Sequence, residues 1–596
     1  MFEKRLLAAT DNAISKLYGP GFDLSLLTIE RTKKEIEGDY TLVVFPLLKL
    51  SRKSPEQTAS ELGGMLLKEL SEISSYKVIK GFLNLIMSDE FWISFLSENY
   101  NRDEFGVCPV LSEEKVVFEY SSPNTNKPLH LGHIRNNLLG HSLSQILTAS
   151  GFPVIKVNLV NDRGIHICKS MLAYMKWGEG ETPASSGMKG DKLIGKYYVL
   201  FDKKYKEEIK DLIEKGITED EAGQLSHLMI EAREILRKWE DGDRETVNLW
   251  KLMNGWAYEG FEVTYNRLGV EFDHIYYESD TYLSGKELVV EGLAKGVLRK
   301  HEDQSIWIDL TSEGLDEKLL LRSDGTSVYM TQDLGTAQIR YDDYHPSRMI
   351  YVVGNEQNYH FDVLKRILLK LNKPYAPSIY HLSYGMVELP EGRMKSREGT
   401  VVDADDLMEE MYTTAADMTI KLGKAGGFPG KEAEKLFEAI GLGALKYYIL
   451  KVDPRKNMLF DPKESIDFNG NTGPFIQYTY ARINSLISKA SVMSQLPGKD
   501  TILTGFSLMP SEKETIKSLM IYPQVVSQAA DELNPAIVAN YVYELAKKYN
   551  QFYQEIPVLK EENPGLRQLR LMLSVFTASV IRKSLNLLGI ESPERM

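Results

Sequence analysis

The residues with the clearest capacity for chemistry lie between Glu119 and His133, in the stretch EYSSPNTNKPLHLGH. An apolar run ends at Tyr120, a loop with two prolines follows, and HLGH at 130–133 opens a helical pattern. Unpaired N–H groups at a helix start attract anions, and Gly132 allows a ligand to approach the backbone closely. His130 and His133 share one helix face there. This arrangement is suited to a bound triphosphate.

A second cationic segment lies far along the chain, in GRMKSREGTVV at 392–402. Arg393, Lys395 and Arg397 stand among glycines in a short polar stretch. Guanidinium and ammonium groups are the side chains that bind phosphate oxygens most strongly. Taken alone, a basic loop of this kind is usually a solvated surface loop. Together with HLGH, it predicts a loop that clamps phosphates.

Both segments resemble the two signatures of class I aminoacyl-tRNA synthetases, HLGH the HIGH motif and RMKSR the KMSKS loop. Lys127 just ahead of HLGH, YMTQD at 329–333 and GNEQNYH at 354–360 narrow the resemblance to arginyl-tRNA synthetases. GDY at 38–40 and GFLNL at 81–85 resemble the N-terminal extension of that family. The resemblance covers the chain from its N-terminal region to its last residue.

Composition sets broad limits on the class of protein. The chain has 596 residues, of which 43% are apolar and 26% charged, as in ordinary globular proteins of several domains. Only Cys108 and Cys168 are present, which excludes a disulfide framework and favours the cytoplasm. No apolar run approaches a membrane span, and no signal peptide is evident, so no membrane partner is expected. The net charge of −13 argues weakly against a nucleic-acid partner.

The elements that must position the two segments follow the α/β pattern. We expect a Rossmann-like parallel-sheet catalytic domain with an insertion, a small N-terminal α+β domain and a C-terminal all-α helical bundle. Strands are predicted at 115–120, 154–160, 349–353 and 379–387, with a single strand at 78–87 near the N-terminus. Four domains are predicted. Residues 1–110 form an N-terminal tRNA-contacting domain, and residues 111–405 form the catalytic domain with its insertion at about 166–275. Residues 406–470 form a helical linker that contacts the tRNA stem, and residues 471–596 form an anticodon-binding bundle with helices at about 471–493, 511–531, 535–553 and 565–588.

The resemblance implies roles for the phosphate-facing residues. The implied catalytic residues are His130, His133, Lys127, Gly132 and Lys395, and the implied ATP-binding residues are His130, Gly132, His133, Arg393, Met394, Ser396, Lys395 and Arg397. RMKSR departs from KMSKS because Ser396 replaces its second lysine. Arginyl enzymes commonly lack that lysine, and Lys127 occupies the position thought to replace it. The implied nucleotide is ATP with Mg²⁺, and no metal site or zinc is expected in the protein.

The amino-acid end of the site needs carboxylates, because a guanidinium is bound best by planar bidentate acceptors. Matching the family residue by residue points to Glu278 and Asp333 for the guanidinium, with a hydrogen bond from Tyr329. Tyr329 lies one helical turn before Asp333, which favours a common face. The α-amino and carboxylate ends are assigned to Asn124, Gln357 and to Ser122 or Glu119.

The C-terminal region contains the aromatic segment NTGPFIQYTYARI at 471–483. Aromatic residues at helical spacing are core residues more often than not, but exposed ones can stack on unpaired bases. The resemblance assigns Phe475, Tyr478 and the final Met596 to the anticodon loop. The expected partners are therefore tRNA(Arg), L-arginine and ATP, and the chain is expected to act as a monomer.

The implied function is two-step arginylation of tRNA, with tRNA needed for the first step. Three alternatives stand beside this function. In the first, His130 and His133, with His166 and Cys168, would form a zinc site or be purely structural. In the second, the chain would be another class I synthetase, such as a cysteinyl or glutamyl enzyme. In the third, it would be a catalytically inactive tRNA-binding paralogue. The loop NDRG at 161–164 departs from the glycine, aspartate and tryptophan common in the family, which bears on the detail of that loop.

Overall fold

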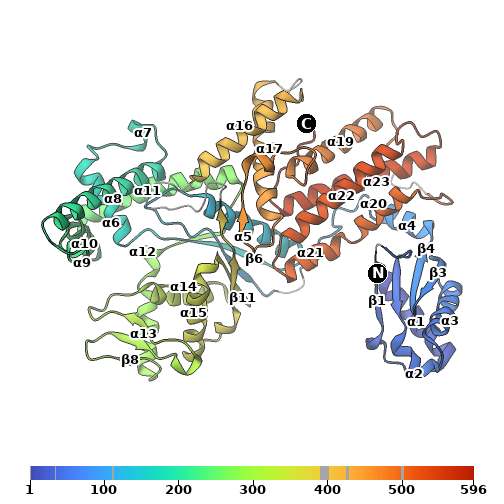
Figure 1. The fold of residues 1–596 in the computed structure, drawn as a ribbon, viewed down its shortest axis with the longest axis horizontal. Coiled ribbons are helices and arrows are strands. Elements are labelled where there is room, and N and C mark those ends of the chain that lie inside the picture. The colour runs from blue at the N-terminus through green and yellow to red at the C-terminus, as the bar shows by residue number, and fades with distance from the viewer. Residues whose placement is uncertain (1, 34, 111–112, 389–401, 424–428, 498–502) are drawn as a thin grey trace. The chain divides into compact units, whose positions relative to one another are not determined.

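The computed structural model describes residues 2–33, 35–110, 113–388, 402–423, 429–497 and 503–596 (Figure 1). The chain forms two compact units, and each is assembled from separate stretches of sequence. Unit 1 contains Met1–Phe105, Ile483–Ile521 and Lys547–Val580. Unit 2 contains Gly106–Arg482, Tyr522–Ala546 and Ile581–Met596.

Unit 1 contains a four-stranded antiparallel sheet in the order β1-β2-β4-β3, with helices packed on it. The elements of this α+β part are α1 (Phe2–Tyr18), β1 (Thr28–Arg31), β2 (Tyr40–Val43), α2 (Leu48–Ser51), α3 (Pro55–Glu69), β3 (Ile73–Ile79), β4 (Phe82–Met87) and α4 (Asp89–Asn99). The start of α3 is fixed by a capping box between Ser54 and Gln57, with Pro55 at the first helical position. Leu62 and Leu83 are fully buried between helix and sheet.

The prediction of a single strand at 78–87 is wrong. The segment contains the end of β3, a two-residue turn and the whole of β4, and the two strands pair antiparallel from Ile79 and Phe82 onward. Lys80 and Gly81 have φ angles of 51° and 79°, a left-handed pair that closes a two-residue hairpin loop. The continuous apolar run concealed this turn, because only Gly81 marks it in the sequence.

Unit 1 also joins its sheet to helices from the C-terminal part of the chain. Lys517 of α20 (Pro510–Met520) is ion-paired with Asp39 at 2.7 Å, and Lys513 with Asp89 at 2.8 Å. The rings of Phe105 and Phe576 pack edge to face with centroids 4.9 Å apart. The N-terminal sheet therefore folds together with residues from near the other end of the chain.

Unit 2 is built on a five-stranded parallel sheet in the order β12-β11-β5-β6-β7. Its strands are β5 (Val116–Glu119), β6 (Val154–Val160), β7 (His274–Tyr277), β11 (Arg348–Gly354) and β12 (Ile379–Tyr384). The four predicted strands at 115–120, 154–160, 349–353 and 379–387 are confirmed, with β12 ending before the predicted limit. The order reverses between β5 and β11, and ligands bind at such a switch point beyond the strand carboxyl ends.

Two helices follow the central strands, and their first residues lie at that edge of the sheet. These are α5 (Leu131–Ala149), after β5, and α15 (Asn358–Lys370), after β11. The side of α5 facing the sheet is close-packed, since a Cβ on Gly140 would lie 2.2 Å from the ring of Tyr120. The N-terminus of α5 is thereby held against the end of β5.

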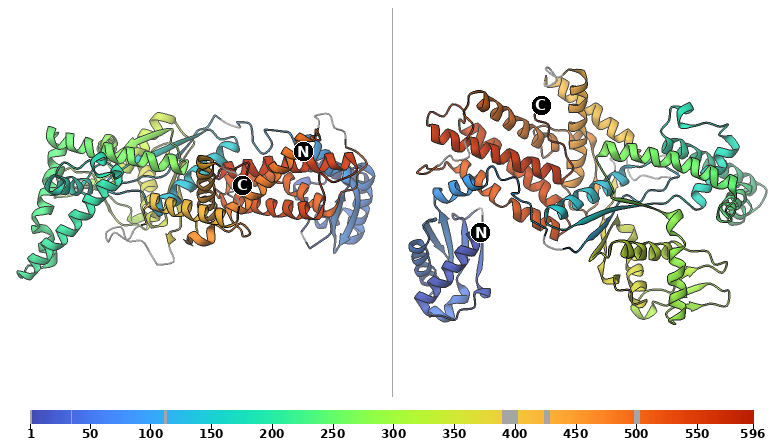
Figure 2. Two further views of the ribbon diagram at one scale, coloured as in Figure 1. Left: turned by 90° about the horizontal axis from the view of Figure 1, so that it is seen from above. Right: turned by 180° about the vertical axis from the view of Figure 1, so that it is seen from behind.

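A helical insertion separates β6 from β7, as predicted. Its helices are α6 (Ile165–Trp177), α7 (Pro183–Ser186), α8 (Gly190–Glu214), α9 (Glu219–Leu225), α10 (His227–Glu240) and α11 (Arg244–Leu268). These helices stay grouped together in every view (Figures 1 and 2). Pairs α8–α11 and α6–α8 pack directly on each other.

A second, smaller module lies between β7 and β11. It holds α12 (Glu278–Thr281), α13 (Ser284–Ala294), the antiparallel strands β8 (Arg299–Lys300), β9 (Ile306–Ile308) and β10 (Lys318–Leu321), and α14 (Tyr329–Tyr344). Its core is continuous with that of the large sheet through residues such as Leu334, Val363 and Tyr351. This module carries α12 and α14 to the edge of the site.

The remaining elements of the chain are helical, with one short pair of strands. They are β13 (Val387–Glu388) and β14 (Met458–Leu459), with α16 (Ala404–Lys421), α17 (Gly430–Leu450), α18 (Pro462–Ser465), α19 (Gly473–Val492), α21 (Tyr522–Asp531), α22 (Ala536–Glu555) and α23 (Pro564–Leu587). The predicted helix at 511–531 is two helices, α20 and α21, because Pro523 starts a new helix after Ile521.

The expected fold class is confirmed: a parallel-sheet domain with an insertion, an N-terminal α+β part and C-terminal helices. Among the helices that the structure describes, none is long and apolar enough to cross a membrane.

Candidate functional site

A cavity of about 460 Å³ lies at the switch point of the sheet in unit 2. It is bordered by segments that follow three of the parallel strands: the loop after β5 with the start of α5, the turn after β11, and the residues after β12. The lining residues are Ser121, Ser122, Lys127, His130, Gly132, His133, Asn136, Val352, Val353, Gly354, Glu356, Gln357, Tyr384, Met386 and Val387. Six of the predicted site residues are among them: Ser122, Lys127, His130, Gly132, His133 and Gln357.

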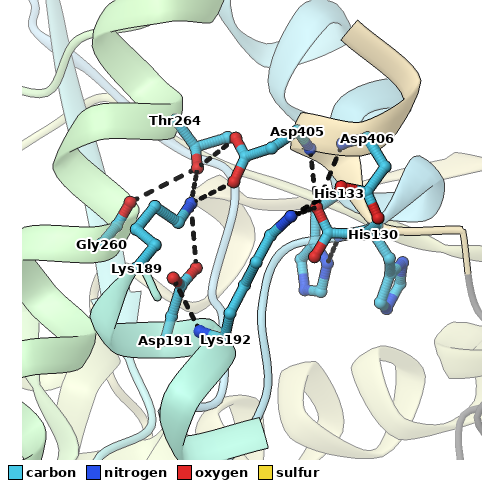
Figure 3. A network of polar contacts seen from close by, with 10 residues as sticks. His130, His133, Lys189, Asp191, Lys192, Gly260, Thr264, Asp405 and Asp406 are labelled. Atoms are coloured by element: carbon cyan, nitrogen blue, oxygen red, sulfur yellow. Dashed lines mark hydrogen bonds and ion pairs between the residues drawn. The ribbon is translucent and has the colours of Figure 1, made fainter. Parts of the chain in front are cut away.

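The two histidines occupy the first turn of α5, with their ring centroids 3.9 Å apart (Figure 3). Nδ1 of His130 accepts a hydrogen bond from the backbone N–H of Gly132 at 3.1 Å. Nδ1 of His133 accepts from the backbone N–H of His130 at 3.2 Å. In a neutral imidazole the nitrogen that accepts carries no hydrogen, so each ring carries its hydrogen on Nε2. The helix start thus presents two Nε2–H donors.

Burial keeps both rings neutral. Burial, with the nearby Lys127 ammonium acting in the same direction, lowers the pKa of His130 to about 3. It also holds the pKa of His133 well below its usual range, with His130 and Lys127 acting in the same direction. The pKa of Lys127 is itself lowered by burial. At neutral pH the site therefore combines two uncharged donors with one ammonium group.

The backbone after β5 is strained, which sets the direction of the loop that follows. Ser121 and Ser122 have φ angles of 82° and 47°, a left-handed conformation that costs energy for residues with a Cβ. Their N–H groups donate to side-chain oxygens of Asn136, at 2.5 Å, and Asn158, at 2.9 Å. These two buried asparagines stabilise the turn and hold the loop over the cavity.

The predicted phosphate loop at 393–397, with its residues Arg393, Met394, Lys395, Ser396 and Arg397, lies outside the described residues. The described residues on either side of this loop lie beside the cavity or the two histidines. Val387 lines the cavity before the gap. After the gap, Leu131 donates its N–H to the carbonyl of Val402 at 3.1 Å, and His130 forms a β-bridge with Asp403.

The start of α16 is fixed to the insertion by charged side chains (Figure 3). Lys189 is ion-paired with Asp405, whose other oxygen accepts from the Thr264 hydroxyl at 2.9 Å. Lys192 donates to Asp406 at 2.7 Å. This network connects α8 and α11 with the segment that returns beside the two histidines.

An acidic pair stands on α12 and at the start of α14. Glu278 is 6% exposed, and burial, with added repulsion from Asp162 and Asp333, raises its pKa to about 7 against attraction from Arg163. Tyr329 is 71% exposed, and the nearby Glu278 carboxyl contributes to raising the pKa of its hydroxyl. Glu278, Tyr329 and Asp333 are therefore close enough to interact, as their predicted common role requires. They do not line the 460 Å³ cavity itself.

Sequence reasoning missed the roles of Asp162 and Arg340, which support the segments that carry this acidic pair. Asp162 is fully buried and accepts from both the N–H, at 2.8 Å, and the hydroxyl, at 2.7 Å, of Ser279, next to Glu278. Arg340 of α14 is buried in an ion pair with Glu119 of β5, which also accepts from the Ser122 hydroxyl at 2.8 Å. Of these residues, only Glu119 stands out in the sequence, as a charged residue in the apolar run VVFEY at 116–120.

The other predicted residues lie elsewhere in unit 2. Asn124 is exposed and forms a β-bridge with Asn161, outside the cavity lining. Phe475 and Tyr478, both half-buried, are on α19: the Phe475 ring packs 5.5 Å from that of Tyr543, and the Arg482 guanidinium lies 4.8 Å from the centroid of the Tyr478 ring. Met596 is half-buried at the chain end.

The proposed zinc alternative finds little support in the surroundings of its residues. His166 shares a 3.1 Å hydrogen bond between its Nδ1 and the Tyr198 hydroxyl, and burial raises the pKa of the Cys168 thiol to about 12, which disfavours a thiolate ligand. Within the described ranges, no group of three or more metal-ligating side chains is present.

The geometry and the comparisons with known proteins agree on the class. Residues 103–461 match the family described as "tRNA synthetases class I (R), catalytic domain". Residues 476–596 match the "DALR anticodon binding domain", and residues 4–87 match the "Arginyl tRNA synthetase N terminal domain". The parallel sheet with its HLGH helix is thus the catalytic fold of a class I aminoacyl-tRNA synthetase.

Two relatives identify the family of class I synthetases to which the chain is related. The chain is 56% identical to the arginine–tRNA ligase of Parabacteroides distasonis over 597 residues, and 56% identical to that of Bacteroides thetaiotaomicron over 595 residues, with 100% of each chain covered in both cases. The arginyl-tRNA synthetase structure from Thermus thermophilus matches with a TM-score of 0.77 and 25% identity, covering 100% of both chains. The chain belongs to the arginyl-tRNA synthetase family.

Proposed function

We propose that the protein attaches L-arginine to tRNA(Arg) in two steps. In the first, a carboxylate oxygen of arginine attacks the α-phosphorus of ATP, taken as its Mg²⁺ complex, and pyrophosphate leaves. In the second, the 2′-hydroxyl of the terminal adenosine of the tRNA attacks the carbonyl carbon of arginyl-adenylate, and AMP leaves. Neither step needs a covalent bond to the protein, so positioning and charge stabilisation carry the catalysis.

The proposal is supported by the phosphate donors and Gln357 in one cavity lining, and by the contact of Asp333 with His360, one turn after Gln357. His130 and His133 would donate their Nε2–H groups to phosphate oxygens, since both Nδ1 atoms are already occupied by backbone N–H groups. Lys127 would supply the positive charge that opposes the charge developing at the α-phosphate, together with Lys395 of the 393–397 loop. Val387 lines the cavity before that loop, and after it Val402 and Asp403 pair with Leu131 and His130, which supports this role.

At the amino-acid end, Asp333 and Glu278 would accept the guanidinium fork, and Tyr329 would add a hydrogen bond. Gln357 lines the same cavity as the phosphate donors, which supports contact with the α-amino or carboxylate group. Ser122 stands at the same cavity. The exposed Asn124 would reach the substrate from the same loop. Lysine would be rejected, because one ammonium group cannot satisfy two planar acceptors and would leave a buried carboxylate unpaired.

The tRNA would be held at three places along the chain. The N-terminal part (1–110) and the helical segment 406–470 would contact its body, and the bundle 471–596 would read the anticodon. Phe475 and Tyr478 are half-buried, which leaves part of each ring able to stack on a base. The scarcity of cysteine supports action in the cytoplasm. The requirement for tRNA in the first step is carried over from the family resemblance.

Exchange of labelled pyrophosphate into ATP tests the function directly. Each amino acid is supplied in turn, with and without tRNA(Arg), and exchange is expected only with arginine and only when tRNA is present. Exchange with cysteine or glutamate would identify another class I activity, and binding of tRNA without any exchange would identify an inactive paralogue. Exchange with arginine in the absence of tRNA would show that the first step does not require tRNA, while the proposed reaction itself would stand.

Asp333→Ala tests the arginine site within that function. This variant is expected to abolish use of arginine while the KM for ATP stays close to that of the unmodified protein. An unchanged KM for arginine would show that the guanidinium is bound elsewhere.

A further inference from the structure

The segment GNEQNYH at 354–360 ends in a histidine that the proposed reaction does not use. His360 lies in the first turn of α15, one turn after Gln357, and its Nε2 is 2.5 Å from Oδ2 of Asp333 on α14. Both side chains are partly enclosed, with 25% of His360 and 34% of Asp333 exposed. Asp333 is therefore held from one side before any substrate enters.

This contact constrains which lone pairs of Asp333 remain for a ligand. A carboxylate has about four acceptor positions on two oxygens, and a guanidinium fork needs one on each oxygen in the same plane. A donor on Oδ2 occupies one position and prevents the carboxylate from rotating about its χ2 bond. This contact leaves Oδ1 and the second acceptor position of Oδ2 for a guanidinium fork.

The chemical type of the donor matters as much as its position. An imidazole presents a single N–H from a rigid ring toward the carboxylate, whereas a lysine or arginine there would place several donors against the same acceptor and compete with the guanidinium. Other titratable groups that face this corner are Glu278 from α12, whose pKa Asp333 helps to raise, and His381 from β12, whose pKa His360 helps to lower. His360 is the donor that contacts Asp333 directly.

We propose that His360 is a positioning residue for arginine selection: by donating Nε2–H to Asp333, it fixes the carboxylate in the plane in which a guanidinium fork can bind. The proposal rests on the proposed role of Asp333 as guanidinium acceptor. His360 itself does not touch the reacting atoms. His360 lies one turn after Gln357, at the start of α15. The same helix start would therefore position the groups that bind both ends of arginine, the Asp333 carboxylate and Gln357.

Two variants of His360 separate positioning from general structural damage. His360→Ala removes the donor, and we expect the KM for arginine in aminoacylation to rise about tenfold to a hundredfold, the range for losing a hydrogen bond to a charged group. The KM values for ATP and tRNA and the kcat at saturating arginine should stay within about twofold. His360→Gln keeps an N–H donor of similar reach and should restore most of the arginine affinity. His227→Ala, an exposed histidine at the start of α10, is the matched control and should change none of these values.

Asp333→Asn and the double variant Asp333→Asn/His360→Ala complete the test. If His360 acts only through Asp333, its removal should have no further effect on the KM for arginine once the carboxylate is gone. A large effect of Asp333→Asn with none of His360→Ala would overturn the inference and leave the proposed arginine site intact. No effect of Asp333→Asn would remove that site. Additive effects in the double variant, or failure of His360→Gln to restore affinity, would show that His360 acts by another route.

Discussion

The raised pKa of Glu278 predicts that arginine affinity depends on pH within the physiological range. Burial is the largest cause of that shift, which takes the pKa from 4.5 to about 7. The shift corresponds to roughly 3 kcal/mol disfavouring the ionised carboxyl before the substrate arrives. The guanidinium needs the ionised form, so binding must remove a proton whenever the pH is below that pKa.

The size of the effect follows from the fraction of Glu278 that is ionised. With a pKa of about 7, this fraction falls about tenfold between pH 8 and pH 6, and the affinity for arginine falls by the same factor. The direction is fixed: affinity is full above pH 8 and is lost as the pH decreases. Neither histidine of HLGH contributes in this window, because His130 and His133 stay neutral throughout it.

Steady-state aminoacylation at saturating ATP and tRNA, from pH 6 to pH 8, measures the KM for arginine. The unmodified protein is expected to show the tenfold change. Glu278→Gln should bind arginine more weakly at pH 8 but with a flat profile. Asp280→Asn, which removes an exposed carboxylate two residues away on the same helix, is the control and should keep the unmodified profile. A flat profile in the unmodified protein, or an unchanged slope in Glu278→Gln, would refute the assignment.

Three further substitutions test the framework around the site. Arg340→Ala should lower the free energy of unfolding of unit 2 by about 3–5 kcal/mol, because Glu119 is left buried without its ion-pair partner. Chemical denaturation followed by circular dichroism measures this change, and an unchanged midpoint would contradict the prediction. Gly132→Ala should reduce kcat about tenfold or more without raising the KM for arginine, since the new Cβ would lie 3.0 Å from Cε1 of His130 and displace the ring; an equal rise in both KM values would point to general damage instead. Lys127→Met should slow single-turnover adenylate formation about a hundredfold while equilibrium arginine binding stays unchanged; a normal rate would remove Lys127 from the phosphate site.

The sequence predicted four of the five strands of the parallel sheet, and it missed β7, a four-residue strand with two exposed residues. VVFE at 116–119 and VIKVNLV at 154–160 are apolar runs bounded by turn residues, which leave few other interpretations. The start of α5 was equally visible, since a proline-containing loop and a glycine mark it. These features are local, so single-sequence reasoning is sufficient to find them.

The features that were missed depend on partners distant in sequence. Nothing near His360 indicates that it will meet Asp333, and nothing near Glu119 indicates Arg340, because the sheet order brings those segments together. The hairpin at Lys80–Gly81 was missed for a different reason: the apolar pattern continues through a turn that only backbone angles reveal. The identity of the residues in the acidic pair came from the family resemblance, and the pKa of Glu278 came from the degree of burial that only the fold defines.

The composition of unit 1 has a consequence for how the chain is made. Residues up to Phe105 share that unit with Ile483–Ile521 and Lys547–Val580, which leave the ribosome much later. At ordinary elongation rates the interval is about 20–80 s. During it, Phe105 lacks the Phe576 ring against which it packs in the finished protein, and Asp39 lacks the Lys517 ammonium. Nascent chains should therefore hold an exposed apolar surface at their N-terminal end until synthesis is nearly complete, a window in which chaperone binding or aggregation competes with folding.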